Sequence, residues 1–521
     1  MSRLLLFGLI FAALVLLWQW RSGCYQGDLA GNPDEPAHVI SSLLIRDYVA
    51  DGMPEAPIPF ARNYYVHYPK VAIGHWPPLF HVAEAMWMLL FGRTQAAMLA
   101  LVAVSAIALL ICVFAWVSRR CGTVAGFFAA VTLMLPMAMR EAMDSVEPDI
   151  VLVLLSFLAA AAYGRFLEDG RRKYVFVFWI LAAAAMATHG RGAALCFLPA
   201  VTALTLRRFR QAWFSILFSV AIIISATFLP HWLGQAYRFS PQEALANMWI
   251  VPLRVIAACG WPVAVVAILG CVAIFRARQV PPEWHAVGAL VLSSFLFYIL
   301  VNVPVDGRYL MPTVPAIAAF FGAGIASVAR IAKARWHVPF AGGALAALAC
   351  GAAIPLLHIS ERKYDPGIHR MVNAGRVAGI ATRVYLISGD PQYEGALIVD
   401  IALADARLDH VVLRASKVLF HSAWLGTYYR LLFNDSPSMA AWFDQARVGA
   451  IILQKPDPRP HLPQLLSMIE RPGSPWVRVN DPRIPAAAEV FRRAPPPPTG
   501  GRPNIRIDMR ADQSAYFDLR Y

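Results

Sequence analysis

Long apolar runs follow one another along most of the chain. Runs of about 17–25 apolar residues recur from Leu4 onward, and each can cross the roughly 30 Å hydrocarbon layer as a helix. A soluble domain can bury one such run, but not many in succession. A hydrophobic fraction of 58%, a charged fraction of 15% and a mean hydropathy of +0.53 agree with this. The sequence therefore predicts a polytopic α-helical membrane protein.

About eleven transmembrane helices are expected, the first of them a retained signal anchor. They lie at 4–20, 95–117, 122–139, 149–166, 174–188, 192–206, 211–230, 257–275, 284–303, 310–329 and 338–357. Basic clusters occupy alternate connections, at 119–120, 165–173, 207–210, 276–278 and 330–335. The positive-inside rule then predicts a cytoplasmic N-terminus, and the odd number of spans places the C-terminal region outside. The net charge of +14 follows this topology pattern, so we expect no nucleic-acid partner.

The apolar segment 75–91 needs a separate interpretation. It opens with two prolines and carries His81 and Glu84, and counting it as a span would reverse the sign of every later loop. We therefore predict an interfacial helix on the outer leaflet, with Trp76 and Trp87 at the headgroup level. The segment 241–254 could behave in the same way.

The composition changes near Ile359, where the long apolar runs end. Strand-like and helix-like segments then alternate, which predicts a small soluble α/β domain with a mainly parallel sheet. These segments are 383–388, 395–406, 410–414, 436–447 and 450–453. The predicted organisation is a transmembrane domain at 1–358 with interfacial helices in an outer loop at 21–94, an α/β domain at 359–494, and a Pro-rich linker and tail at 495–521.

Adjacent carboxylates, Asp34 and Glu35, lie in the first outer loop, with His38 one helical turn later. Such a carboxylate can take the proton of an acceptor hydroxyl near the membrane surface. The alternative is structural, with Asp34 capping a helix and Glu35 favouring its positive end.

A second acidic group precedes the span at 149–166. It contains Asp144, Glu147 and Asp149, and Asp149 opens the span. Asp149 is either an ordinary first-turn charge or a partner of the first-loop carboxylates across a cavity. In the second case Asp34, Asp149 and His38 are candidate ligands for a divalent metal.

Cations at the outer ends of spans depart from the positive-inside pattern. These are His189 and Arg191 between two spans, and Arg308, followed by Tyr309, before the span at 310–329. An anionic group such as a lipid phosphate would explain them, because arginine binds phosphate in a bidentate manner. Snorkelling of long side chains at helix ends is the alternative.

These features, in this order over residues 1–330, resemble the GT-C membrane glycosyltransferases. The similar branch contains protein O-mannosyltransferases, aminoarabinose transferases of lipid A and Rgt-like enzymes of glycosyltransferase family 39. The matching elements are Asp34-Glu35, Trp76-Pro-Pro-Leu to Phe91-Gly92, Asp149, Thr188-His-Gly-Arg191 and Arg308-Tyr-Leu-Met-Pro312-Thr-Val-Pro315. The chain departs from the family where His189 replaces a usual lysine, and Asp144 competes with Asp149 for the second acidic role.

The resemblance implies the GT-C fold and an inverting hexosyl or pentosyl transfer from a polyprenyl-phosphate donor. Asp34, Glu35 and Asp149 would be the catalytic residues, with Asp34 as the base. Arg308, His189, Arg191 and Tyr309 would bind the donor phosphate. The acceptor would be a hydroxyl of a lipid, glycan or protein outside a bacterial inner membrane. The resemblance requires no cofactor, and relatives differ in whether they use a metal.

Other functions remain open from the sequence. A polyprenyl-lipid flippase would carry charges in mid-span, but here they cluster at helix ends. A non-catalytic anchored subunit would bind its partner through the α/β region. In that region Glu394-Gly-Ala and Leu413-Arg-Ala-Ser-Lys417 are distinctive, and Arg414 and Lys417 could contact an acceptor glycan or another anion.

Overall fold

The computed structural model forms two compact units. It describes residues 2–29, 32–72, 74–228, 241–301, 307–336, 383–405, 408–422, 429–482 and 484–497, with short pieces at 343, 347, 351, 367–368, 371–372, 505–508 and 518–520. The helical unit comprises Met1–Arg21, Gly74–Phe80 and Leu99–Ser360, and the α/β unit comprises Ser22–Ile73, His81–Met98 and Glu361–Tyr521. The first loop and the C-terminal region thus belong to one unit.

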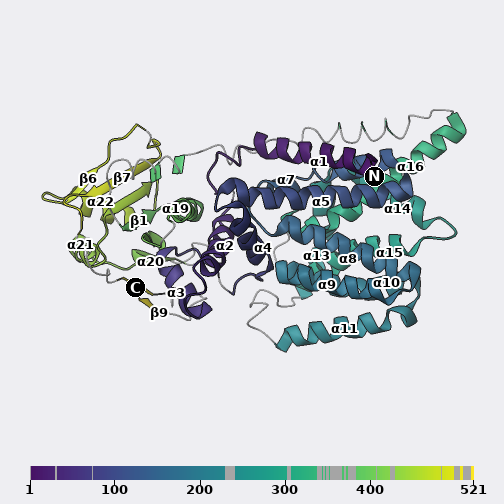
Figure 1. Cartoon of the computed structure of the whole chain (residues 1–521), viewed down its shortest axis with the longest axis horizontal. Coiled ribbons are helices and arrows are strands. Elements are labelled where there is room, and N and C mark those ends of the chain that lie inside the picture. The colour runs from purple at the N-terminus through teal and green to yellow at the C-terminus, as the bar shows by residue number, and fades with distance from the viewer. Residues whose placement is uncertain are drawn as a thin grey trace. The chain divides into compact units, whose positions relative to one another are not determined.

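Helices that run side by side build the helical unit (Figure 1). They are α1 (Ser2–Arg21), α5 (Gln95–Cys121), α6 (Thr123–Thr132), α7 (Met137–Met143), α8 (Asp149–Asp169), α9 (Arg172–Thr188), η1 (Gly190–Phe197), α10 (Leu198–Leu206), α11 (Phe209–Phe228), α13 (Pro241–Cys259), α14 (Trp261–Phe275), α15 (Pro282–Leu300), η2 (Gly307–Thr313) and α16 (Val314–Trp336). The buried faces of most of them share one apolar core. Val251 and Val255 of α13 belong to a second, smaller cluster.

The helical unit contains long apolar helices, so the chain is a multi-pass membrane protein as predicted. Among the described residues, five helices are long and apolar enough to cross a membrane, or up to seven if each bent pair counts as one span. Three shorter apolar helices accompany them. The expected number of eleven differs because several predicted spans are short or broken, and the span at 338–357 lies almost wholly outside the described residues.

Two apolar segments are bent rather than continuous. Helices α6 and α7 meet at 81°, where Pro136 cannot donate a backbone hydrogen bond. The Arg140 guanidinium donates to the Leu135 carbonyl at 2.5 Å and so satisfies backbone exposed by the break. Helices α13 and α14 meet at 111° around Gly260, whose φ of 82° a side chain would disfavour. The predicted interfacial segment at 241–254 is the first arm of this second bend.

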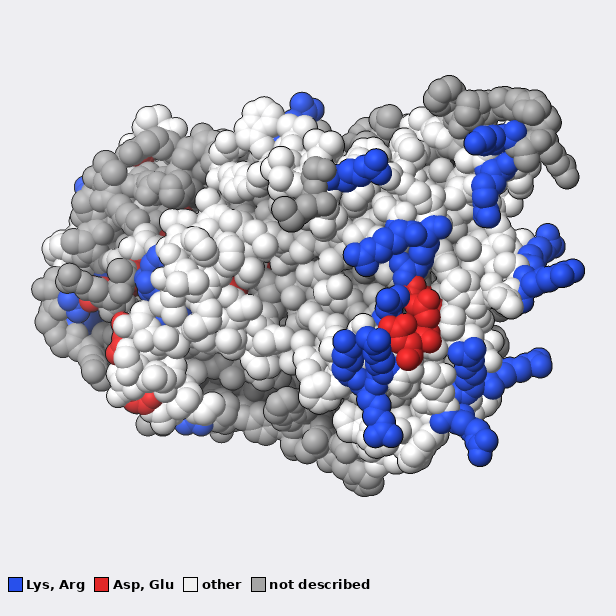
Figure 2. Space-filling model, turned by 45° about the vertical axis from the view of Figure 1, so that its right-hand side comes forward, with Lys and Arg blue, Asp and Glu red and all other residues white. Residues whose placement is uncertain are grey.

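The basic clusters converge at one end of the helical unit (Figure 2). Glu283 in the first turn of α15 pairs with Arg120 at the end of α5 and with Arg165 of α8, the latter at 3.5 Å. Arg208, which precedes α11, donates to the Leu167 carbonyl of α8 at 3.3 Å. Asp149 lies at the other end of the 21-residue helix α8. The clusters therefore share an end, as the topology argument expects.

Glycines allow α14 and α16 to pack backbone to backbone. A Cβ atom on Gly270 would collide with the Phe320 carbonyl oxygen, and one on Gly324 would collide with that of Val266. Small residues at such crossings are typical of membrane helices. In lipid the hydrophobic effect does not drive helices together, so van der Waals contact between closely packed backbones stabilises the pair instead.

The α/β unit contains a five-stranded sheet of order β2-β1-β5-β7-β6 (Figure 1). The strands are β1 (Val384–Ser388), β2 (Val411–Arg414), β5 (Ala450–Gln454), β6 (Trp476–Arg478) and β7 (Ala488–Arg493). Strands β2, β1 and β5 are parallel, as predicted, while β7 and β6 add an antiparallel edge that the sequence did not predict. The small pairs β3 (Phe420–Ser422) with β4 (Tyr429–Leu431), and β8 (Arg506–Asp508) with β9 (Asp518–Arg520), lie outside this sheet.

Helices from both ends of the chain complete the α/β unit. The C-terminal ones are α19 (Pro391–Ala404), α20 (Ala415–Val418), α21 (Ser436–Gln445) and α22 (His461–Glu470). The first loop adds α2 (Glu35–Ala50), α3 (Pro57–His67) and most of α4 (Leu79–Phe91), the predicted interfacial helix. Helix α2 packs against α19, since a Cβ on Gly395 would lie only 2.8 Å from Pro36 Cγ.

Candidate active site

A buried carboxylate in the helical unit binds two arginines. Asp149 opens α8, is fully buried, and accepts from Arg191 of η1 through Oδ1. Its Oδ2 accepts from Nε and Nη2 of Arg308 in η2, both at 3.1 Å. Arg191 also donates to the Arg308 carbonyl at 3.1 Å. The structure thus brings together three of the predicted site residues, from segments far apart in the sequence.

Glu147 is a further member of this group. Its carboxylate accepts from Arg308 Nη2 at 2.5 Å and is buried, so two carboxylates balance two guanidinium groups. The Arg308 side chain is 26% exposed, whereas those of Arg191 and Asp149 are 5% and 0% exposed. Arg308 is therefore the charged side chain of this group that an incoming anion can reach.

His189 and Tyr309 surround Arg191. His189 Nδ1 accepts from the backbone N–H of Arg191 at 3.1 Å and from its Nε at 3.2 Å, so this ring nitrogen carries no proton. A neutral His189 consequently holds its proton on Nε2, which can donate to an anion. The Arg191 guanidinium lies over the Tyr309 ring, 5.0 Å from the centroid.

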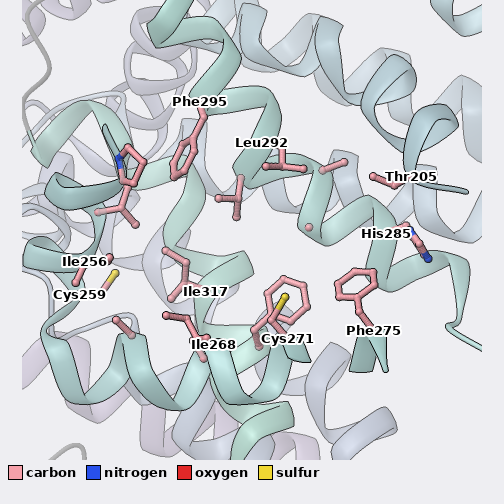
Figure 3. A pocket seen from close by; sticks show the side chains of 18 residues that line it. Thr205, Ile256, Cys259, Ile268, Cys271, Phe275, His285, Leu292, Phe295 and Ile317 are labelled. Atoms are coloured by element: carbon pink, nitrogen blue, oxygen red, sulfur yellow. The ribbon is translucent and has the colours of Figure 1, made fainter. Parts of the chain in front are cut away.

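An apolar cavity of 360 Å³ lies within the helical unit (Figure 3). It is lined by residues of α10, α13, α14, α15 and α16, and the side chains of Ile256, Leu292 and Ile317 face the same space. Phe295 and Ile317 line this cavity and also pack in one cluster with Tyr298 and Tyr309. Tyr298 donates to the Tyr309 carbonyl at 2.6 Å. Residues that line the cavity therefore pack directly against Tyr298 and Tyr309, and Tyr309 is the neighbour of Arg308 in the chain.

Asp34 and Glu35 lie at the start of α2 in the α/β unit. The Asp34 side chain makes no capping hydrogen bond. Instead Asn32 Oδ1 accepts from the backbone N–H of Asp34 at 2.8 Å and of Glu35 at 3.1 Å. The explanation of Asp34 as the capping side chain is thus wrong, because the Asn32 side chain accepts the hydrogen bonds at the start of α2. Glu35 is fully buried, while Asp34 is partly exposed.

His38 is buried and faces α4. Its Nδ1 lies 2.9 Å from His81 Nε2, so the two rings share one hydrogen bond. Burial lowers the pKa of His81 to about 4, which keeps that ring neutral. Among the described residues no group of three or more His, Cys, Asp or Glu side chains could hold a metal ion. Asp34, Asp149 and His38 stay predictions as metal ligands, and we derive no step through a metal.

Glu84, one turn beyond His81 on α4, is fully buried. Neither carboxyl oxygen has a hydrogen-bond partner among the described residues, and burial raises the pKa of Glu84 well above its usual value. We expect Glu84→Met to stabilise the fold by about 1–3 kcal/mol, since it removes two unpaired buried oxygens. The folded chain keeps a proton that the unfolded chain loses above the ordinary pKa of 4.5, so stability falls as pH rises.

The gain from Glu84→Met should therefore be larger at pH 8 than at pH 5, measured by thermal or denaturant unfolding. Exposed Glu470→Met is the matched control, with a change within about 0.5 kcal/mol. A loss of stability in the Glu84→Met variant at both pH values would show that Glu84 has a partner.

The chain shares its fold with known membrane enzymes. Residues 75–233 match the family model described as dolichyl-phosphate-mannose-protein mannosyltransferase. ArnT from Cupriavidus metallidurans, solved bound to undecaprenyl phosphate, is similar with a TM-score of 0.56 and 14% identity, covering 93% of this chain and 97% of ArnT. Its apo form gives the same TM-score at 15% identity, with the same coverage. A sequence comparison with curated proteins gives no match. These similarities, together with the apolar spans and the C-terminal sheet, identify the chain as a multi-pass membrane protein of the GT-C fold.

Proposed function

We propose that the protein is an inverting glycosyltransferase that moves a sugar from a polyprenyl-phosphate donor to an acceptor hydroxyl. The observation that carries this proposal is the arginine pair, Arg191 and Arg308, which both bind the Asp149 carboxylate. Two guanidinium groups held by one buried carboxylate, beside an apolar cavity, suit a ligand with a phosphate head and an apolar tail. The fold supports it, since ArnT of the same fold was solved with undecaprenyl phosphate.

The phosphate would bind at Arg308, the exposed member of the pair, with His189 Nε2–H and Arg191 nearby. As the sugar–phosphate bond breaks, negative charge grows on the leaving phosphate and these groups stabilise it. Asp149 would act as a positioning residue rather than as a base, because both of its oxygens bind arginines. The isoprenoid tail would occupy the cavity that Phe295 and Ile317 line.

Asp34 would be the base that removes the proton of the acceptor hydroxyl. Its carboxylate is not consumed by helix capping, and it is partly exposed. Attack of the activated hydroxyl on the anomeric carbon, opposite the phosphate, inverts the sugar's configuration. Glu35, buried in the first turn of α2, would act beside Asp34 as a second carboxylate of the catalytic site.

We place the protein in a bacterial inner membrane, with the basic end of the helical unit in the cytoplasm. Arg120, Arg165 and Arg208 gather at that end, while Asp149 begins the other end of α8. By the positive-inside rule the arginine pair and the α/β unit would then face the periplasm.

The test uses purified full-length protein and a panel of labelled polyprenyl-phosphate sugars with candidate acceptors. Wild type should release free polyprenyl phosphate, and Arg308→Gln should lower kcat/KM by about 100-fold. Exposed Arg276→Gln at the basic end is the matched control and should keep full activity. Tight donor binding without release in any combination would instead favour a lipid transporter.

Glu147→Gln is expected to tighten binding of undecaprenyl phosphate by about tenfold. Glu147 and the phosphate compete for Arg308 Nη2, which now lies 2.5 Å from the carboxylate, and the amide competes less. Binding can be followed by intrinsic fluorescence in detergent. Weaker binding than in wild type would show that Glu147 positions Arg308 rather than competing for it.

A further inference from the structure

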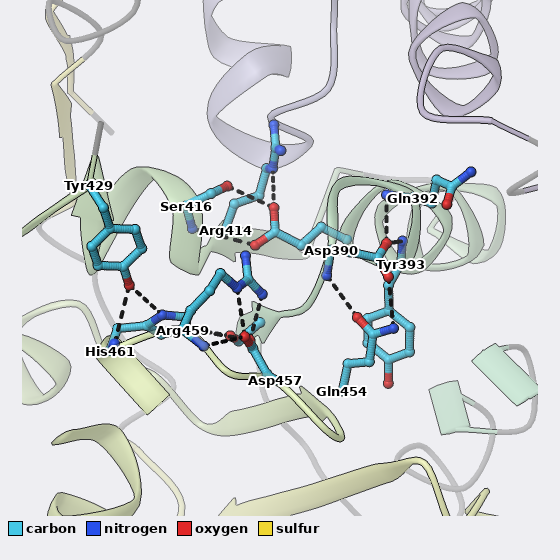
Figure 4. A network of polar contacts seen from close by, with 12 residues as sticks. Asp390, Gln392, Tyr393, Arg414, Ser416, Tyr429, Gln454, Asp457, Arg459 and His461 are labelled. Atoms are coloured by element: carbon cyan, nitrogen blue, oxygen red, sulfur yellow. Dashed lines mark hydrogen bonds and ion pairs between the residues drawn. The ribbon is translucent and has the colours of Figure 1, made fainter. Parts of the chain in front are cut away.

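Two sequence runs of unassigned role meet in the α/β unit (Figure 4). Glu394 of α19 is buried and accepts from Arg414 Nε at 2.9 Å and from Ser416 Oγ at 2.7 Å. Arg414 ends β2, and Lys417 follows in the next turn, on α20. The distinctive runs around Glu394 and Leu413–Lys417 are therefore two halves of one polar cluster.

This cluster lies at the carboxyl ends of the parallel strands. Strand β2 pairs with one edge of β1, and β5, which comes later in the chain, pairs with the opposite edge of β1. The direction in which strands are added to the sheet therefore reverses between β1 and β5. In open α/β sheets ligands bind outside the carboxyl ends of the strands near such a reversal. The cluster lies beside it, at the ends of β1 and β2. Ser388 and His461, which bond to each other at 2.7 Å, are buried and brace this edge rather than face a ligand.

Lys70 from the first loop joins the same cluster. Arg414 Nη1 donates to the Pro69 carbonyl at 3.3 Å, which holds this loop against the end of β2. Lys70 Nζ donates to the Pro391 carbonyl at 3.4 Å, at the start of α19. A Cβ on Gly395 would lie 3.3 Å from Lys70 Cε, so the lysine side chain packs closely against this glycine.

Asp34 lies near this group within the same unit. Gly395 touches Pro36, two residues after Asp34, and Asp34 interacts electrostatically with Lys70. Lys70, Arg414 and Lys417 face the carboxylates of Glu394 and Asp34, and Glu394 is already engaged by Arg414 and Ser416. The cations thus exceed the carboxylates beside the proposed base.

We propose that Lys70, Arg414 and Lys417, at the carboxyl edge of the α/β sheet, bind an anionic group of the acceptor. The acceptor would then be an acidic glycan or glycolipid, with a carboxylate or phosphate near the hydroxyl that receives the sugar. This inference rests on the proposed function. Arg414, fixed by Glu394 and Pro69, would set the position of the anion, and the two lysines would supply the charge that selects it.

The protonation of the two lysines provides a second readout of anion binding. Burial, and then the charge of Arg414, lower the pKa of Lys70 to about 7 and of Lys417 to about 8, against the opposing effect of Glu394. A bound anion would raise both pKa values, so binding at pH 8 should take up protons. Calorimetry in two buffers of different ionisation enthalpy measures this uptake.

The binding test uses the full-length protein with trigalacturonate, a phosphorylated galactotriose and neutral galactotriose. We expect the acidic sugars to bind at least tenfold more tightly than galactotriose, and the comparison of the first two separates carboxylate from phosphate. Lys70→Gln and Lys417→Gln should each weaken acid binding by about five- to tenfold. Lys417→Arg should retain it, and exposed Arg471→Gln on the same unit should change nothing.

Equal affinity for acidic and neutral sugars, no binding of either acid, or unchanged affinity in both Gln variants would overturn the inference. Undecaprenyl phosphate binding is measured on the same preparations. If the protein binds undecaprenyl phosphate but not the acidic sugars, the proposed acceptor subsite is wrong and the transferase proposal stands. If undecaprenyl phosphate binding is absent too, the transferase proposal itself fails.

Discussion

Asp34→Asn should lower the kcat of sugar transfer by about 10²- to 10⁴-fold and leave KM for the donor nearly unchanged. A general base contributes this much when it removes a proton in the transition state, and an amide of the same shape cannot accept it. Because Asn32 caps α2, the change should not disturb the helix. Steady-state release of polyprenyl phosphate, with a saturating acceptor, measures both constants.

Asp51→Asn at the exposed far end of α2 is the matched control and should retain wild-type kcat. Equal kcat in wild type and Asp34→Asn would remove Asp34 from the mechanism. A fall in both kcat and thermal stability would instead assign Asp34 a structural role.

Asp149→Ala should destabilise the helical unit by about 3–5 kcal/mol. It leaves the Arg191 guanidinium, which is 5% exposed, without its counter-charge, and removal of one partner from a buried ion pair has this cost. The same variant should weaken undecaprenyl phosphate binding, because Arg308 loses one of its two carboxylate partners and is held less firmly. Thermal unfolding in detergent and a binding titration check the two effects separately.

Glu168→Ala provides the comparison, since the Arg165–Glu168 pair is exposed and should contribute at most about 1 kcal/mol. If Asp149→Ala and Glu168→Ala lowered the unfolding temperature equally, the Asp149 carboxylate would not be the centre of the arginine pair.

Residues that signal through local pattern could be predicted from the sequence. The long apolar helices α5 and α8, the short apolar helix α4, and the parallel strands β1, β2 and β5 follow from run length, prolines and alternation. The interfacial position of α4 stays a prediction. The predicted topology puts Asp149, Arg191 and Arg308 at outer helix ends, but it offers Asp149 the first-loop carboxylates as partners, whereas the structure pairs it with the two arginines. The role of each in a reaction stays a prediction.

Features set by tertiary contact could not be predicted. The His38–His81 bond joins residues 43 apart, and nothing in either segment indicates the other. The bend at Pro136 does not show in the apolar run at 122–139, which is long enough to be one span. The hydrogen bond from Arg140 to the Leu135 carbonyl, which supports the bend, is a contact of the folded chain. Asn32 is a usable signal, since Asn favours N-caps, but the nearby Asp34 is an equally favoured N-cap residue, so the pattern alone does not decide between them.

The contact of Gly395 with Pro36 has a consequence for biosynthesis. Helix α2 is translated early, whereas its partner α19 appears only after all the helices of the helical unit described here. At about 5–20 residues per second, the first loop waits tens of seconds for the strand and helix that complete its packing. A nascent chain that stalls before β1 would carry the membrane helices but no assembled α/β unit. The start of α2, where Asp34 lies, would thus reach its packed setting only after translation has passed α19.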